Sequence, residues 1–156
     1  MINGGLAFED SSHLPGGSLR DLGLIIYIDG ASRGNPGPAG IGVSILDSKG
    51  EPLTEDSAYI GVATNNVAEY RAFLRALKKA REMGASRVQI MTDSELLCRQ
   101  MKGLYRVRDA KLIPLFREAV HLTRGFEKVA LRHIPRAKNG RADQLANLGI
   151  DAGSRG

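Results

Sequence analysis

The 156-residue sequence has no tryptophan, a single cysteine and an aromatic content of only 5%. With Cys98 alone, no intramolecular disulfide can form, so the fold depends on a packed core. No apolar run approaches the roughly 18 residues that a membrane-spanning helix requires. Residues 1–22 lack a basic start followed by an apolar core, which argues against a secretory signal peptide. We therefore expect a cytoplasmic protein with no membrane partner.

The composition is that of an ordinary globular chain, with 42% hydrophobic and 25% charged residues. Its length suits one domain. Residues 1–22 are rich in Gly, Ser, Asp and Pro and are predicted to form a flexible N-terminal tail. We expect residues 23–150 to form the ordered domain and residues 151–156 a C-terminal tail. Lys and Arg number 22 against 17 acidic residues, and this net charge of +5 suits a polyanionic partner without establishing one.

Apolar periodicity divides the ordered domain into strands and helices. The predicted strands are residues 24–29, 41–47, 53–61, 87–92 and 129–134. The predicted helices are residues 65–83, 94–102, 109–124 and 139–149, with a break at Pro114 and a cap at Asn139. The cations predicted to form a solvated face on the first helix are Arg71, Arg75, Lys78, Lys79 and Arg81. The order βββαβαβα predicts an α/β fold with a mixed sheet and helices on its faces.

Four acidic residues occupy positions that such a fold brings together. Asp29 ends the first strand and Asp93 ends the fourth, so both emerge at one edge if these strands are parallel neighbours. Glu69 and Asp143 each lie in the first turn of a helix. Taken singly, each acid also fits a turn or helix cap, or a favourable interaction with a helix dipole. A cluster of all four is costly unless a cation neutralises it.

The predicted donor set consists of carboxylate oxygens, without histidine or cysteine. Such hard ligands favour Mg²⁺ or Mn²⁺ and disfavour zinc. Two such ions roughly 3.5–4 Å apart are a common device for phosphodiester hydrolysis, in which one activates water and the other stabilises the leaving oxygen. The four acids are therefore predicted to be metal ligands and not proton carriers.

Four motifs occur in a telling order: DGASRGNPGPAG, TNNVAEY, TDSELL and PRAKNGRADQLANLG. Together they resemble the type 1 ribonuclease H family, in a short form like those of bacteria and archaea. The resemblance covers residues 24–150, and it implies a ribonuclease H-like fold with a five-stranded mixed sheet flanked by helices. It also implies an endoribonuclease that hydrolyses the RNA strand of RNA/DNA hybrids, leaving 5′-phosphate and 3′-hydroxyl ends. The implied catalytic and metal-binding residues are Asp29, Glu69, Asp93 and Asp143.

The resemblance also implies contacts with the hybrid. Asn35, Asn65 and Asn66 match positions that touch it, and an amide can both donate to and accept from a ribose 2′-hydroxyl. Thr64 matches a residue that holds a DNA-strand phosphate. From the residues alone, Asn35 is equally a turn residue and the other three are equally helix caps.

The sequence departs from the family pattern at three places. The family often has a catalytic histidine in a loop before the last acid, whereas here His133 falls in a predicted strand and Arg136 and Lys138 occupy the loop. Of these we favour Arg136 as the electrostatic helper. Glu95 stands where some relatives have an amide, and we expect it to bind substrate by accepting a hydrogen bond from a ribose 2′-hydroxyl, although its charge alters binding. The region 101–125 has few aromatic residues and no separate hybrid-binding domain is visible, so affinity is predicted to be salt-dependent.

Two alternatives remain open at this point. One is a related nuclease of the same superfamily that acts on double-stranded RNA or DNA structures. The other is a catalytically inactive module that binds hybrids, which the presence of all four acids disfavours. Nothing in the sequence suggests an oligomer, so we expect a monomer.

Overall fold

The structure is a computed structural model that describes residues 23–154, so the predicted N-terminal tail and residues 155–156 lie outside the described residues. The strands are β1 (Gly23–Ser32), β2 (Gly37–Asp47), β3 (Pro52–Ala63), β4 (Arg87–Thr92) and β5 (Lys128–His133). The helices are α1 (Asn65–Glu82), α2 (Glu95–Met101), α3 (Ile113–Thr123) and α4 (Gly140–Ser154), with a short 3₁₀ turn at Arg136–Lys138. Among the described residues, no helix has the length and apolar character needed to cross a lipid bilayer.

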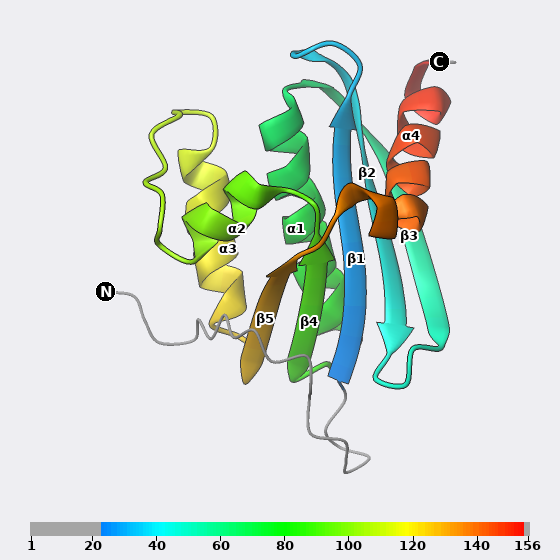
Figure 1. Cartoon of the computed structure of the whole chain (residues 1–156), viewed down its shortest axis with the longest axis vertical. Coiled ribbons are helices and arrows are strands. Elements are labelled where there is room, and N and C mark those ends of the chain that lie inside the picture. The colour runs from blue at the N-terminus through cyan, green and yellow to red at the C-terminus, as the bar shows by residue number, and fades with distance from the viewer. Residues whose placement is uncertain (1–22, 155–156) are drawn as a thin grey trace.

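The strands form one five-stranded sheet in the order β3-β2-β1-β4-β5 (Figure 1). The first three strands are antiparallel, as a meander requires, whereas β4 pairs parallel with both β1 and β5. This is the mixed sheet that the element order predicts. β1 lies at its centre, so the first motif of the chain sits between the meander and the parallel half.

Helices cover both faces of the sheet. Alternate residues of β1, namely Leu24, Ile26 and Ile28, are fully buried in the core that α1 covers, with α2 and α3 beside it. On the opposite face α4 packs on β1, β2 and β3. The contact is close because β2 presents Gly42, where a Cβ would lie 2.3 Å from the carbonyl oxygen of Ala142. The sheet therefore places one helix from each side near the same end of β1 (Figure 1).

Two sequence-based boundaries near the first hairpin are wrong. β1 does not end at Asp29 but continues to Ser32, and β2 begins at Gly37. The intervening turn is correspondingly short, and Arg33 N donates a 2.9 Å hydrogen bond to Pro38 O across it. Gly30, Gly37 and Gly40, which the predicted strand bounds leave in the turn, pair in the ladders instead. A small residue fits a strand on which a helix packs closely.

The predicted C-terminal tail from residue 151 is also wrong in part, because α4 continues to Ser154. Gly149 does not stop the helix. It brings α4 against β3, where a Cβ would lie 2.5 Å from Ala58 O. Two residues later, Asp151 forms a 2.7 Å ion pair with Arg33 of the first hairpin. These contacts hold the last turns of α4 on the domain.

Smaller corrections concern α1 and α3. Pro114 lies in the first turn of α3, where proline needs no amide partner, so residues 109–112 precede this helix and do not belong to it. Glu69 falls just after the first turn of α1 and not within it. Gly84 follows α1 with a φ of +82°, the left-handed conformation expected of a helix stop.

Candidate active site

The carboxylates of Asp29, Glu69 and Asp93 converge, with one oxygen of each within 4.8 Å of the others. Asp143 joins them from α4, and its carboxyl group is near enough to raise the pKa of Asp29. All four acids line one hollow of about 380 Å³. The predicted cluster therefore exists, although Asp29 and Asp143 are 114 positions apart in the sequence.

The register of the two central strands explains how two of these acids meet. β1 and β4 are parallel neighbours, and their ladder ends at the pair Tyr27 and Met91. Asp29 and Asp93 each lie two residues beyond that pair. Because side chains alternate along a strand, equal offsets bring both carboxylates out at the same edge of the sheet. The prediction that these strands are adjacent and parallel is confirmed.

Glu69 reaches the cluster because α1 lies very close to β1. A Cβ on Gly30 would be 2.2 Å from the carbonyl carbon of Ala68, so only glycine permits this approach. The backbone N–H of Gly30 then donates a 3.1 Å hydrogen bond to Oε1 of Glu69. The glycine after Asp29 thus orients a second acid of the cluster.

The cluster is electrostatically unfavourable without a cation. Burial, followed by the charges of Asp93 and Asp143, raises the pKa of Asp29 from 3.8 to about 8. Burial and the charges of Asp29 and Asp93 likewise raise the pKa of Glu69, against the smaller opposing effects of the Gly30 amide and Arg136. A partly buried group of oxygen ligands whose negative charges repel one another fits a divalent cation such as Mg²⁺ or Mn²⁺.

The loop before α4 brings Arg136 but not His133 to this hollow. Arg136 lies in the 3₁₀ turn and lines the hollow, and its charge lowers the pKa of both Asp29 and Glu69. His133 is the last residue of β5, is exposed, and does not line the hollow. Lys138 lines a different hollow, so of the three basic candidates only Arg136 lines the hollow of the acids.

The predicted hybrid-contacting residues form a corner between the first hairpin and α1. Asn35 Oδ1 accepts a 3.0 Å hydrogen bond from the amide of Asn65, and Asn65 Oδ1 accepts a 2.9 Å bond from Ser32 N. Thr64 caps α1 by accepting from Val67 N at 3.2 Å. Asn65 also lines the hollow of the acids.

Asn66 and Glu95 do not line that hollow. Asn66 is an exposed residue of the first turn of α1. The carboxylate of Glu95 instead forms a 2.8 Å ion pair with Arg99 one turn along α2. Ser94 caps α2 by accepting a hydrogen bond from Leu97 N. The cap of α2 is therefore Ser94 and not Asp93, whose carboxylate belongs to the cluster of acids.

Sequence reasoning missed two amides beside the acids. Asn139, predicted as a cap of α4, donates from Nδ2 to Ile28 O at 2.8 Å and to Asp93 Oδ2 at 3.4 Å. Its Oδ1 accepts from no group of the described residues, so the cap prediction is wrong. Asn147 donates to the backbone carbonyl of Asp143 and accepts a 3.2 Å hydrogen bond from Arg33. The four-residue spacing of Asn139, Asp143 and Asn147, which puts them on one side of a helix start, is the only sequence signal for either.

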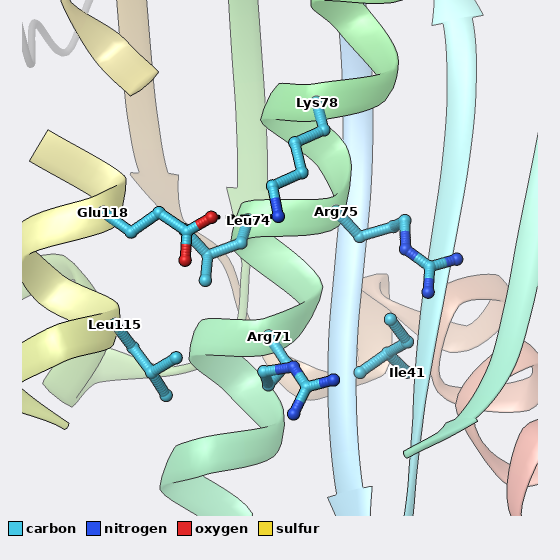
Figure 2. Close-up of a pocket in the computed structure, with 7 residues that line it drawn as sticks. All are labelled: Ile41, Arg71, Leu74, Arg75, Lys78, Leu115 and Glu118. Carbon is cyan, nitrogen blue, oxygen red and sulfur yellow. Dashed lines mark ion pairs between the residues drawn. The ribbon is translucent and has the colours of Figure 1, made fainter. Parts of the chain in front are cut away.

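A second hollow, of about 340 Å³, lies between α1, α3 and β2 and contains none of the acids (Figure 2). Two of the cations predicted to form a solvated face are paired here, Arg75 with Asp56 and Lys78 with Glu118. Arg71 has no such partner among the described residues and points into the hollow (Figure 2). The face of α1 is therefore partly neutralised, and Lys78 joins α1 to α3.

Known proteins resemble the chain along most of its length. Residues 27–149 match the family model described as "Reverse transcriptase-like". Ribonuclease HI of Halobacterium salinarum is 37% identical over 94% of this chain and 78% of its own length. The bifunctional protein Rv2228c of Mycobacterium tuberculosis is 40% identical over 85% of this chain, which spans 36% of that longer protein.

Solved structures give the same result. The crystal structure of RNase H1 from Halobacterium salinarum superposes with a TM-score of 0.81, at 40% identity, over 83% of this chain and 98% of that one. LC11-RNase H1, solved in complex with an RNA/DNA hybrid, gives a TM-score of 0.79 at 48% identity, over 83% of this chain and 98% of that one.

Proposed function

This chain belongs to the type 1 ribonuclease H family, and from that premise we propose that it hydrolyses the RNA strand of RNA/DNA hybrids. The products would carry 5′-phosphate and 3′-hydroxyl ends. One observation carries the proposal: four carboxylates, from β1, α1, α4 and the segment that follows β4, meet in one hollow at the edge of the sheet. A relative that is 48% identical has been solved with an RNA/DNA hybrid, which supports this substrate class.

Asp29, Glu69, Asp93 and Asp143 would hold two divalent ions, Mg²⁺ or Mn²⁺. When bound, such ions supply an activated water and charge stabilisation for the leaving 3′-oxygen. The protein supplies ligands that are already gathered: Asp29 and Asp93 each lie two residues beyond the end of the β1–β4 ladder, and Gly30 orients Glu69. The oxygen-only donor set and the raised pKa of Asp29 support a hard cation at this place.

Asn35, Asn65 and Asn66 would read the ribose 2′-hydroxyls of the RNA strand. The carbonyl oxygens of Asn35 and Asn65 are engaged by backbone amides, so their Nδ2 groups are the atoms left to donate to a hydroxyl oxygen. Thr64 at the start of α1 would hold a phosphate of the DNA strand, where helix N–H groups favour an anion. Glu95 would contact substrate from α2 only by leaving its ion pair with Arg99.

Arg136 would stabilise negative charge on the phosphate or the leaving group in the absence of a loop histidine. Its place on the rim of the acid hollow supports this role, whereas the exposed position of His133 at the end of β5 supports none. A guanidinium stays protonated at neutral pH and so does not act as a general acid or base. The contribution of Arg136 would therefore be electrostatic. We further propose a cytoplasmic monomer, in keeping with a domain that contains every ligand of its own site.

Cleavage of an end-labelled RNA/DNA hybrid, with the same RNA as a single strand and as an RNA duplex, tests the proposal. Wild type and Asp93→Asn are compared in Mg²⁺ and in Mn²⁺. Metal-dependent cutting of the hybrid alone, lost in Asp93→Asn, is the expected result. Preferred cutting of the RNA duplex would favour the related nuclease instead. Tight hybrid binding without cutting in either metal would identify a binding module.

A further inference from the structure

The side chain of Asn139 is buried at the point where three elements of the active site meet. Asn139 is 1% exposed and immediately precedes α4. Nδ2 donates to the carbonyl oxygen of Ile28 at 2.8 Å, 111 residues earlier in the chain, and to Oδ2 of Asp93 at 3.4 Å. One amide group therefore joins α4 to β1 and to the segment that follows β4.

The location of these two acceptors is informative. The β1–β4 ladder ends at Tyr27 and Met91, so Ile28 and Asp93 both lie past the last paired residues. Beyond that point no β1–β4 pairing sets the spacing between the two segments, although β1 still pairs with β2 and β4 with β5. This is where Asp29 and Asp93 must stay together. Asn139 connects them across this gap, and its own backbone carbonyl accepts from Asp143 N at 3.1 Å.

We propose that Asn139 is a positioning residue that holds Asp93, Asp29 and Asp143 in the arrangement that binds the divalent ions. It acts through its two donated hydrogen bonds and is not itself a ligand. The inference rests on the proposed function, because it concerns the same acids. Residues that orient metal ligands in this way commonly control metal affinity as strongly as some ligands do.

Two simpler roles do not explain this side chain. A helix cap would use Oδ1 as an acceptor, but Oδ1 accepts from no described group and is buried. Simple filling of space would not select an amide, because a buried acceptor without a partner destabilises a fold. The geometry therefore favours the donated bonds of Nδ2 as the reason for an asparagine here.

Metal binding by Asn139→Ala and Asn139→Asp, measured by titration calorimetry with Mg²⁺ and Mn²⁺ in the absence of nucleic acid, tests the inference. Asn139→Ala removes both donors and is expected to weaken metal binding by roughly 10–100-fold. Asn139→Asp preserves shape but offers only oxygens, so it is expected to weaken binding as well, although it adds a negative charge. Hybrid affinity in EDTA is expected to stay within about twofold of wild type for both variants.

Gln100→Ala is the matched control. Gln100 is another buried amide, 5% exposed, whose Oε1 accepts a 2.7 Å hydrogen bond from Tyr70 and which contacts none of the acids. Its loss is expected to lower the melting temperature but to leave metal affinity unchanged. A purely structural role for Asn139 would give the same pattern and would overturn the inference.

The remaining outcomes are also decisive. Metal binding by Asn139→Asp as tight as that of wild type would show that the donated bonds are dispensable, and it decides the matter even if Asn139→Ala fails to fold. A wild-type protein that binds metal and cuts the hybrid, with variants that bind equally well, refutes the inference alone. A wild-type protein that neither binds metal nor cuts the hybrid refutes the proposed function together with it.

Discussion

The backbone amide of Gly30 donates a 3.1 Å hydrogen bond to the carboxylate of Glu69, and the two residues are 39 positions apart in the chain. This bond joins the central strand to α1 next to Asp29. It exists because Gly30 has no side chain: a Cβ there would lie 2.2 Å from the backbone of Ala68. The strand thus places one acid directly and a second through its neighbouring glycine.

Gly30→Ala is therefore expected to damage both stability and activity. The new methyl group must displace the start of α1, and overpacking of this kind costs about 1–3 kcal/mol of unfolding free energy. Because Glu69 moves with the helix, hybrid cleavage is expected to fall by at least about tenfold. Urea denaturation and initial cleavage rates measure the two effects. Gly125→Ala is the control, because a Cβ at Gly125 would lie 3.4 Å from its nearest neighbour, an ordinary contact distance. An equal loss of stability and cleavage rate in that variant would contradict the explanation.

The stability of the metal-free protein is expected to fall as the pH rises from about 4 towards 8. In the unfolded chain Asp29 ionises near its ordinary pKa of 3.8, whereas in the fold its pKa is raised to about 8. Over that interval the folded state binds more protons than the unfolded state, so raising the pH favours unfolding. Melting temperatures in EDTA across this range measure the effect.

Two additions to the same melting series act as controls. Asp29→Asn removes the charge that the other acids repel, so its melting temperature in EDTA is expected to decline less with pH. Saturating Mg²⁺ is expected to stabilise the wild type most at high pH, because its ligands must be deprotonated to bind. Stability of the wild type in EDTA that rises from pH 4 to 8 would show that the buried carboxyl of Asp29 is not the dominant group.

Arg136→Ala is expected to lower the cleavage rate by roughly 10–100-fold, because it removes a positive charge from the rim of the acid hollow. His133→Ala is expected to retain activity within about threefold, since the imidazole is an exposed group at the end of β5 and surface changes of this kind have small effects. Single-turnover rates on the hybrid at saturating Mg²⁺ compare them. A larger loss of cleavage rate in His133→Ala than in Arg136→Ala would assign the catalytic role to His133 instead.

Thr64→Ala separates a structural role from a binding role. Loss of the cap on Val67 N is expected to cost about 1 kcal/mol of unfolding free energy. If Thr64 also holds a phosphate, hybrid affinity in Ca²⁺ falls as well, by a factor that does not depend on salt because the hydroxyl is uncharged. Thr64→Ser keeps the hydroxyl and is expected to recover both properties. If Thr64→Ala binds the hybrid as tightly as wild type does, the only role of Thr64 is to cap α1.

The site acids were predictable because their signals are local. A carboxylate directly after an apolar run indicates the end of a strand, which locates Asp29 and Asp93. The motifs around all four acids, including Glu69 and Asp143, occur in the order that the family shows. The role of Asn139 was not predictable, since an asparagine before a helix is the usual pattern of a cap. Only the folded chain shows that its amide turns away from α4 towards Ile28, which is far away in sequence.

Glycines were similarly ambiguous in the sequence. Gly149 is the last residue of the predicted final helix, whereas in the fold it lies within α4 and allows that helix to lie on β3. The bounds of the first two predicted strands leave residues 30–40 in the turn, whereas Gly30, Gly37 and Gly40 lie in paired strands. A glycine that relaxes the backbone and a glycine that permits close packing are identical by composition, and the distinction requires the neighbouring element.

The distribution of the four acids along the chain has a consequence for protein synthesis. β1 is made first and lies at the centre of the sheet, but one of its neighbours, β4, and the helix that carries Asp143 are made later. A ribosome that has stopped before residue 143 carries a chain without a complete set of metal ligands. The complete set of four carboxylates therefore exists only when this domain has been made almost to its end.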